Sequence, residues 1–411
     1  MVKPQADDLD RHPPALKIFI STGEVSGDLQ GSLLIKALHR QAGLQGITLE
    51  IRALGGQKMA QAGARLLGDT TGIGSVGIVE ALPYVLPTLQ MQERAKQQLQ
   101  ADPPDVAVYI DYMGPNLSLG KFLRHHLPQV ATVYYIAPQQ WVWAFSPKDT
   151  EALIQISDRM LAIFPAEANY YQKCGADMTW VGHPLVDRFS PPLGRAEARQ
   201  TLGLSATDQV VTLIPASRHQ EVTHIAPLIF AAAQCIQRDV PAVKFLLPIS
   251  MGSLKIKLER LLKTYQLPIS LVEGSSQVAI AAADVALTKS GTVNLEIALM
   301  NVPQVVTYRL NPLTARIGYH LLKIRIPFVS PVNLVLPEPV VPELIQWHAN
   351  PENLAEAVVK LLQDPAERQT MLAGYGRLRQ ALGDPGACDR AAQSILEAAL
   401  ARAARVNEIG A

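Results

Sequence analysis

Short runs of apolar residues alternate along the chain with longer segments in which apolar residues recur every three or four positions. Val106–Ile110 and Ala131–Ile136 are examples of the apolar runs, and the leucines from Leu29 to Leu38 are an example of the periodic segments. An unbroken apolar run is typical of a strand buried on both faces of a parallel sheet, whereas the longer period is typical of a helix with one buried side. The pattern therefore predicts an α/β protein in which strands and helices alternate.

This strand–helix series occurs twice. It runs from residue 16 to residue 187 and starts again over residues 209–350. The polar, proline-containing segment 188–208 between them is predicted to be an interdomain linker with a short helix. Residues 1–15 are polar and proline-rich, which predicts a disordered tail, and residues 351–411 are predicted to be C-terminal helices. The sequence thus predicts two Rossmann-like domains that face each other across a cleft.

The junction after the apolar run Val285–Leu287 carries the strongest ligand-binding pattern. Ser290, Gly291 and Thr292 form a small-residue turn at a helix start, where backbone N–H groups favour a phosphate or pyrophosphate. Glu296 follows one turn later on the same face, where its carboxylate is suited to accept hydrogen bonds from ribose hydroxyls. The alternative is an ordinary connection in which Thr292 is the helix N-cap and Glu296 is solvated. The first interpretation predicts a nucleotide-diphosphate site.

A second small-residue turn follows the first predicted strand. Gly23, Ser26 and Gly27 allow a ligand to approach the backbone at the start of a helix. Glu24 favours sugar hydroxyls, a cation or a role as general base, whereas Asp28 is expected to be a helix cap. This turn is therefore a candidate acceptor site.

Charged residues also stand at the ends of two other predicted strands. Asp111 follows Val106–Ile110 and faces the crevice in which open α/β sheets hold substrates, so it is a candidate general base; alternatively, it caps the loop before the next helix. Ser217 and Arg218 follow the strand that begins the second series. An arginine there can form paired hydrogen bonds to a phosphate, which assigns both residues to the predicted nucleotide site.

Two apolar segments are candidate sites for a sugar or an acyl chain. Trp141 and Trp143 share a face if their segment is extended, and such a face can stack on either group; core packing is the alternative. Gln139 lies in the same segment and is assigned to the same candidate site as the two tryptophans. Ile78–Leu82, which contains Glu80, offers a further apolar face.

Two other patterns are not interpreted as sites. Gly72–Gly77 matches GxGxxG, but it does not directly follow an apolar strand, and a polar helix is predicted where a ribose-binding acid would stand. His183 precedes a proline that restricts its backbone, and it is expected to be structural.

The composition limits the classes of function. Lys and Arg number 37 and Asp and Glu number 36, and the resulting net charge of +1 argues against a nucleic-acid partner. The 3 cysteines match no metal or redox spacing, which indicates a reducing compartment and predicts a cytoplasmic location. Prolines interrupt the uncharged segment Leu127–Pro147, so any membrane contact is expected to be peripheral. An Asp-x-Asp motif occurs only at Asp8–Asp10, so we expect no metal and no cofactor.

Taken together, these motifs resemble those of the lipid-A-disaccharide synthase family of GT-B glycosyltransferases. The resemblance spans nearly the whole sequence and rests on the order and spacing of GEVSGD at 23–28, SVGIVEAL at 75–82, PDVAVYID at 104–111, the segment 138–143, FPAEANYY at 164–171, VGHPLVD at 181–187, PASR at 215–218, SGTVNLEIAL at 290–299, VSPVNL at 329–334 and VPELIQ at 341–346.

The resemblance implies an inverting, metal-independent transfer from UDP-2,3-diacylglucosamine to 2,3-diacylglucosamine 1-phosphate with release of UDP. It marks Glu24, Asp111, Arg218 and Asn333 as residues needed for activity, with Asp111 or Glu24 as the base. It also implies a homodimer with exchanged C-terminal segments, in which the C-terminal helices pack on the N-terminal half or on the partner. Peripheral binding to the inner face of the inner membrane is implied as well.

The sequence departs from the family pattern at several positions. Gly114 stands where the family usually has a second Asp, Ala216 replaces a Gly, Gln139-Gln140 replaces Ser-Val, and Ala144-Phe145 replaces a basic residue. These changes predict an altered acceptor or acyl-chain preference. The alternatives are a transferase that uses a different lipid acceptor, a UDP-sugar 2-epimerase, and a UDP-sugar-binding protein without activity.

Overall fold

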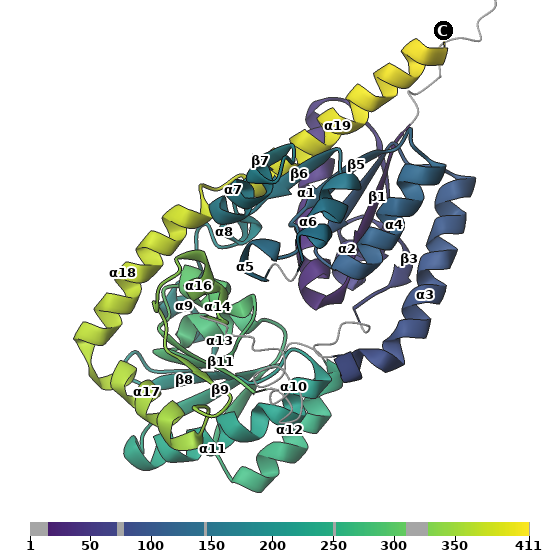
Figure 1. The fold of residues 1–411 in the computed structure, drawn as a ribbon. Coiled ribbons are helices and arrows are strands. Elements are labelled where there is room, and N and C mark those ends of the chain that lie inside the picture. The colour runs from purple at the N-terminus through teal and green to yellow at the C-terminus, as the bar shows by residue number, and fades with distance from the viewer. Residues whose placement is uncertain (1–14, 72–77, 144–145, 250–251, 310–327, 411) are drawn as a thin grey trace, which may run out of the picture. The chain divides into compact units, whose positions relative to one another are not determined.

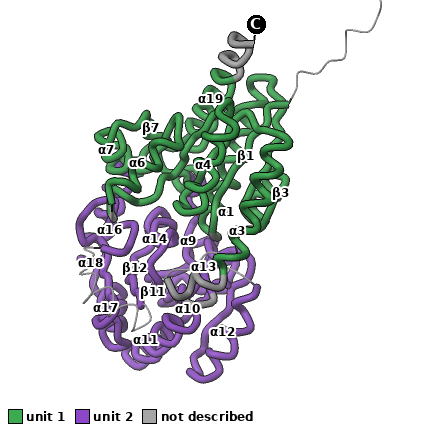
Figure 2. Tube along the Cα trace, turned by 45° about the vertical axis from the view of Figure 1, so that its right-hand side comes forward, with its two compact units in different colours: residues 1–187, 382–411 green, residues 188–381 purple. Residues whose placement is uncertain are grey.

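The computed structural model describes residues 15–71, 78–143, 146–249, 252–309 and 328–410 (Figure 1). The contacts divide the chain into two compact units, one formed by residues 1–187 with 382–411 and the other by residues 188–381 (Figure 2). The predicted tail up to residue 14, the Gly72–Gly77 motif and Ala144-Phe145 lie outside the described residues.

A parallel sheet forms the centre of the first unit (Figure 1). Its spatial order is β3-β2-β1-β4-β5-β6-β7. The strands are β1 (Leu16–Thr22), β2 (Leu49–Gly55), β3 (Arg65–Asp69), β4 (Val106–Ile110), β5 (Ala131–Tyr135), β6 (Arg159–Ala162) and β7 (Met178–Trp180). The helices are α1 (Glu24–Leu44), α2 (Gln57–Gln61), α3 (Ile78–Ala101), α4 (Met113–His126), α5 (Gln140–Trp143), α6 (Pro147–Gln155), α7 (Pro165–Lys173), α8 (Pro184–Arg188) and α19 (Ala387–Gly410). Sequence analysis missed β3, because this edge strand has no buried residue and so lacks an apolar run.

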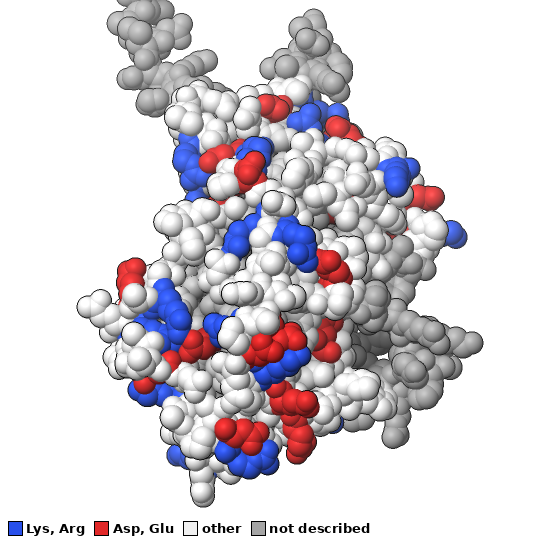
Figure 3. Space-filling view, turned by 90° about the vertical axis from the view of Figure 1, so that its left-hand side faces the viewer, with Lys and Arg blue, Asp and Glu red and all other residues white. Residues whose placement is uncertain are grey.

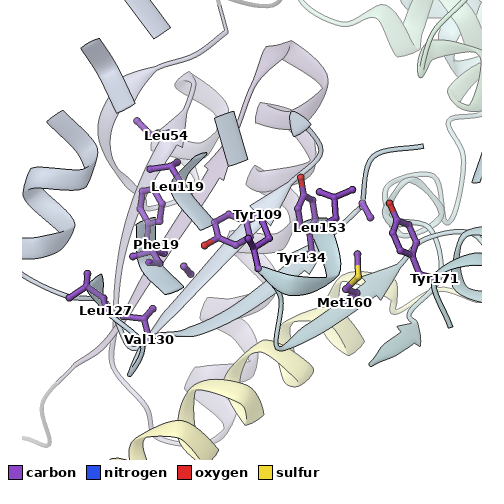
Figure 4. Close-up of a cluster of buried hydrophobic side chains, with 14 of the residues drawn as sticks. Phe19, Leu54, Tyr109, Leu119, Leu127, Val130, Tyr134, Leu153, Met160 and Tyr171 are labelled. Carbon is purple, nitrogen blue, oxygen red and sulfur yellow. The ribbon is translucent and has the colours of Figure 1, made fainter. Parts of the chain in front are cut away.

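Both faces of this sheet are buried, which accounts for the unbroken apolar runs of its central strands. On one face, Phe19, Tyr109 and Tyr134 pack against side chains from α3, α4 and α6 (Figure 4). Successive side chains of a strand point to opposite faces, so Ile18 and Ile20 belong to the other face, which α1 and α19 cover. The C-terminal helix therefore completes the core of the N-terminal unit.

A second parallel sheet forms the centre of the other unit, with the order β10-β9-β8-β11-β12-β13. The strands are β8 (Val210–Ile214), β9 (Lys244–Pro248), β10 (Ile269–Val272), β11 (Val285–Lys289), β12 (Gln304–Tyr308) and β13 (Glu343–Ile345). The described helices are α9 (Arg195–Thr201), α10 (His219–His224), α11 (Ala226–Asp239), α12 (Gly252–Tyr265), α13 (Ser276–Ala282), α14 (Val293–Leu299), α16 (Pro331–Val335), α17 (Pro351–Gln363) and α18 (Pro365–Leu382). Helices α11 and α17 cover one face, and α9 and α13 lie together on the other.

The segment 188–208 contains the short helix that the sequence predicts, α9. Its buried Arg199 donates to Asp284 Oδ2 at 2.9 Å and to the main-chain oxygen of Ala282 at 3.0 Å. A buried arginine side chain must be paired, and these partners fix the segment to the second unit. The predicted block of C-terminal helices is also divided, since α17 and most of α18 belong to the second unit and α19 to the first.

Each sheet has one position at which the strand order reverses direction. In the first unit it lies between β1 and β4, and in the second between β8 and β11. Crevices beyond the carboxyl ends of such strand pairs are where open α/β sheets bind ligands. We therefore expect the ligand-binding residues to lie at these two switch points.

Positive and negative side chains are intermixed on the surface. On the face in Figure 3, Lys and Arg lie beside Asp and Glu in several small groups among uncharged residues, in line with the net charge of +1. No helix among the described residues has both the length and the hydrophobicity needed to cross a bilayer.

Candidate functional site

At the switch point of the first unit, the chain turns sharply after β4. Asp111 and Tyr112 both have positive φ angles, 46° and 50°, a conformation that costs a non-glycine residue about 1 to 3 kcal/mol. The main-chain oxygen of Asp111 accepts hydrogen bonds from Asn116 Nδ2 and the Tyr134 hydroxyl, each at 2.7 Å. These two donors hold the strained turn, which places Asp111, an exposed residue, at the tip of a central strand.

The facing turn after β1 is packed closely against this one. A Cβ atom added at Gly23 would overlap the ring of Tyr112, and one added at Gly27 would overlap Thr22 Oγ1. Both glycines are therefore explained by close packing, whether or not a ligand also approaches them. Glu24 is the first residue of α1, and Ser26 is half-buried in the same turn of helix.

Asp28 is a helix cap, as predicted, although the helix is not its own. Its carboxylate accepts hydrogen bonds from the backbone N–H groups of Gly56, Lys58 and Met59 at 2.9, 3.1 and 3.0 Å, which are the groups left unpaired at the start of α2. Asp28 thereby ties α1 to α2.

The tryptophan segment is helical, so the extended conformation that a shared face of the two tryptophans requires is not present. Trp141 and Trp143 lie in α5, and positions two apart in a helix of 3.6 residues per turn are about 200° apart. The chain turns here because the N–H of Gln140 donates to the oxygen of Pro138 at 2.6 Å and that of Val142 to Gln139 at 3.0 Å. Trp141 is half-buried, with its ring centroid 5.8 Å from that of Phe164, and Gln139 is exposed.

Glu167 holds this segment in place and was not selected from the sequence. Its buried carboxylate accepts the N–H groups of Ala137 at 2.9 Å, Ile163 at 2.9 Å and Phe164 at 3.3 Å. Burial raises the pKa of Glu167 to about 8, and the three N–H donors oppose that rise. Its place three residues after Phe164, at the third position of α7 behind a proline, is a capping-box signal that could have identified it.

His183 is structural, in agreement with the sequence interpretation. It is buried, its Nδ1 accepts the N–H of Leu185 at 3.1 Å, and its ring packs 5.2 Å from that of Phe164. Desolvation lowers the pKa of its imidazole to about 3, so the ring is neutral at physiological pH.

At the switch point of the second unit, Glu221 connects the two strand ends. Its Oε2 accepts the N–H of Ser217 at 2.6 Å and that of Arg218 at 3.1 Å. Its Oε1 lies 3.3 Å from Lys289 Nζ at the end of β11 and 3.8 Å from Arg218 Nη1. Sequence analysis selected Ser217 and Arg218 but missed the buried pair Glu221–Lys289, whose members are brought together by the pairing of β8 with β11.

The turn after β11 is shaped by side chains on both sides of it. Asn294 Oδ1 accepts the N–H of Gly291 at 2.9 Å, and Ser290 Oγ donates to the oxygen of Val329 at 2.7 Å. Thr292 precedes α14 but makes no side-chain capping bond. Its N–H stands at the start of this helix, where helical geometry supplies no partner.

Glu296 is not the solvated residue of the alternative interpretation. It is 8% exposed, and its Oε2 lies 3.5 Å from Nη1 of Arg188. A carboxylate that is buried and ion-paired is held in a defined position, as a ribose-binding group requires. Thr292 is the N-cap residue of α14, as the alternative interpretation had it, although its side chain makes no capping bond. The solvated Glu296 of that interpretation is wrong.

Asn333 is buried and its amide is used within the protein. Nδ2 donates to the oxygen of Val341 at 2.9 Å and to Glu343 Oε1 at 2.8 Å, and Oδ1 accepts the N–H of Val341 at 2.9 Å. Glu343 in turn accepts the N–H of Val329 at 2.8 Å, the residue whose oxygen binds Ser290. The geometry gives Asn333 a positioning role for the turn after β11.

The structure thus gathers the predicted residues into one group in each unit. Gly23, Glu24, Ser26, Gly27 and Asp111 meet at the ends of β1 and β4. Ser217, Arg218, Ser290, Gly291, Thr292 and Glu296 meet around the ends of β8 and β11. The side chains of Glu24, Glu80 and Trp143 lie outside the described part of the structure. The described residues contain no group of three or more His, Cys, Asp or Glu side chains suited to hold a metal ion.

Comparison with known proteins identifies the family. A family model described as lipid-A-disaccharide synthetase matches residues 18–398. Relatives named lipid-A-disaccharide synthase include that of Gloeothece citriformis, which is 50% identical over 382 residues and covers 93% of this chain and 100% of the relative. That of Synechocystis sp. is 50% identical with coverages of 93% and 98%, and that of Geobacter sulfurreducens is 35% identical with coverages of 93% and 97%.

Solved structures share the fold at low identity. The S. aureus MnaA–UDP co-structure has a TM-score of 0.61 at 14% identity and covers 91% of this chain and 94% of its own. CalG4, the calicheamicin glycosyltransferase, has a TM-score of 0.55 at 16% identity with coverages of 95% and 100%. These likenesses confirm the predicted fold class, and the family matches confirm the predicted family. The chain therefore belongs to the lipid-A-disaccharide synthase family, whose members are glycosyltransferases of lipid A biosynthesis with the GT-B fold.

Proposed function

We propose that this enzyme transfers 2,3-diacylglucosamine from its UDP derivative to 2,3-diacylglucosamine 1-phosphate, with inversion at the anomeric carbon. The acceptor's 6-hydroxyl oxygen forms a bond to the anomeric carbon, the bond from that carbon to the diphosphate breaks, and the hydroxyl proton passes to a carboxylate. The products are the disaccharide 1-phosphate and UDP.

The observation that carries this proposal is the position of Asp111, an exposed residue at the switch point of the first unit. Asn116 and Tyr134 bind its main-chain oxygen, so they fix where the residue stands. A general base must be held in a fixed position within reach of the proton that it takes. Glu24, on the adjacent strand end, is the alternative base.

The residues at the switch point of the second unit are suited to bind the nucleotide. Arg218 and the backbone of Ser290–Thr292 are proposed to hold the UDP diphosphate as negative charge develops on the leaving group. Glu296, buried and paired with Arg188, is proposed to bind the ribose hydroxyls. Neither role calls for a metal or a cofactor.

Contact with the inner face of the inner membrane is part of the proposal, because both substrates carry acyl chains. Helix α3 supports it with exposed apolar side chains, which are 48% exposed at Val85, 64% at Leu86 and 56% at Leu89. Transfer of such side chains into an apolar phase is favourable.

We also propose a homodimer, on the basis of the family resemblance. Sedimentation equilibrium would test this oligomeric state.

The test is UDP release by the purified protein in detergent containing EDTA, with UDP-2,3-diacylglucosamine as donor. We expect release that requires 2,3-diacylglucosamine 1-phosphate and yields a disaccharide. Release without the acceptor, accompanied by a 2-epimer, would instead identify an epimerase. Binding of UDP with no release from this donor and acceptor would overturn the proposed reaction and lead to trials of other lipid acceptors.

A further inference from the structure

A lysine that no family motif assigns lies beneath the proposed diphosphate-binding turn. Lys289 is the last residue of β11, directly before Ser290. Its side chain is 8% exposed, and a Cβ atom built on Gly291 would lie 2.7 Å from its Nζ. The ammonium group therefore packs against the Cα atom of the glycine in this turn.

Among the described residues, Lys289 lies close to two other charged side chains at this switch point. Glu221 Oε1 lies 3.3 Å from Lys289 Nζ and 3.8 Å from Arg218 Nη1, while its other oxygen binds the N–H groups of Ser217 and Arg218. Glu221 thereby fixes both cations relative to the backbone, and two fixed cations beside the proposed diphosphate-binding turn suit an anion.

We propose that Lys289 is a further substrate-contacting residue, which donates to a phosphate oxygen of the nucleotide and balances the charge that UDP gains as the glycosidic bond breaks. An ammonium group has three N–H donors, so contacts with Glu221 and with a phosphate oxygen are compatible. A cation that is already fixed and largely dry needs no reorganisation when charge develops beside it. The inference rests on the proposed function for the identity of the anion.

The competing explanation is that Lys289 is only the counter-ion of Glu221. A buried carboxylate that loses its partner is strongly destabilising, so Lys289→Met alone does not separate the two explanations. The double variant Lys289→Met/Glu221→Gln does, because it removes both charges together. A glutamine at 221 keeps an amide oxygen to accept the N–H groups of Ser217 and Arg218.

The experiment measures binding of UDP and of uridine to the full-length protein by titration calorimetry, in four forms: wild type, Glu221→Gln, Lys289→Met and the double variant. A charge-assisted hydrogen bond corresponds to about tenfold in affinity, so Lys289→Met should weaken UDP binding about tenfold and leave uridine binding unchanged. In the Glu221→Gln background the same loss of about tenfold should persist. Lys289→Arg, which keeps the charge, should recover part of the UDP affinity.

Two results would overturn the inference. If the double variant binds UDP as well as Glu221→Gln does, the lysine serves Glu221 alone. If uridine and UDP affinities fall together, the lysine maintains the fold rather than the phosphate contact. The titrations contain no acceptor. A protein that binds UDP but forms no disaccharide would therefore contradict the proposed reaction without affecting the test of Lys289. A wild type that binds UDP no better than uridine would refute the phosphate contact itself.

Discussion

The buried amide of Asn333 donates from Nδ2 to Oε1 of Glu343 at 2.8 Å. The same carboxylate accepts the N–H groups of Val329 and Ser330, and burial raises the pKa of Glu343 while these donors oppose the rise. Since the oxygen of Val329 binds Ser290, the pair connects a residue marked as necessary for activity to the proposed diphosphate-binding turn. We therefore expect Asn333 to act through the position of this turn.

Replacement of Asn333 by alanine should lower both stability and UDP affinity. The change leaves Glu343 and the backbone of Val341 short of partners, and each buried polar group left unpaired costs about 1 to 3 kcal/mol. Denaturant unfolding and UDP titration would measure the two effects. The control is Asn353→Ala, whose Nδ2 binds the oxygen of His348 at the exposed surface and should change stability by less than about 0.5 kcal/mol. An inactive Asn333→Ala with unchanged stability and UDP affinity would contradict the positioning role.

Asp111→Asn should lose most turnover and keep the fold. The hydrogen bonds from Asn116 and Tyr134 go to the main-chain oxygen of residue 111 and survive the substitution. An amide cannot take the acceptor's proton, so we expect kcat to fall about 100-fold or more with UDP affinity unchanged. Glu24→Gln is the parallel variant. If both variants kept near-full turnover, neither carboxylate would be the base.

Acid should destabilise the protein through His183. Its folded pKa of about 3 lies below its ordinary value of 6.5, so the unfolded chain binds the proton more tightly. The stability from the neutral ring is present above pH 6.5 and is lost as the pH falls toward 3. Between pH 7 and pH 5 this group should remove about 2 kcal/mol. Urea unfolding at the two pH values measures the change.

The control for the acid effect is His183→Asn. The asparagine oxygen can still accept the N–H of Leu185, but the side chain no longer titrates. The variant should therefore lose less stability than wild type over this pH interval, whatever its stability at pH 7. An identical loss in both proteins would show that another group is responsible.

Leu86→Ser/Leu89→Ser should weaken binding to lipid vesicles. Both side chains are mostly exposed on α3, so their removal should not destabilise the fold, while the lost apolar area should reduce partitioning about tenfold or more. Vesicle flotation measures the effect. The matched control is Leu44→Ser/Ile256→Ser, which removes two exposed apolar side chains from other helices. Equal losses in the two double variants would argue against α3 as the contact surface.

Gly114→Asp, which introduces the acid usual in the family, should be tolerated. A Cβ atom at this position meets nothing within 4 Å, and residue 114 lies in the first turn of α4, where an acidic residue is favourable. We expect unchanged or slightly higher stability and a changed ratio of kcat/KM between acceptors of different acyl length. An unchanged ratio would remove Gly114 from the explanation of acceptor preference.

Most elements that form the candidate site could be predicted because their signals are local. The apolar run before Asp111 and the small residues around Ser290 are visible in a few consecutive positions, and both lie where predicted, at strand ends. The sequence left open whether the segment of Trp141 and Trp143 is extended, because its conformation depends on distant contacts. Ala137 and Pro138 bind Glu167 and Tyr171 of α7, which stand 30 and 33 positions away.

The sequence by itself determined the two Rossmann-like series, with the exception of edge strands such as β3, and the strand ends at which polar residues gather. It did so because hydrophobic periodicity and turn chemistry act over short stretches. Only the tertiary structure decided which of these residues are buried and which distant residues they contact. The pairing of β8 with β11 joins Glu221 to Lys289, and the contact of Asn333 with Glu343 supports the turn after β11. Such pairs depend on strand order and side-chain burial, which arise when distant segments pack, so no local pattern encodes them.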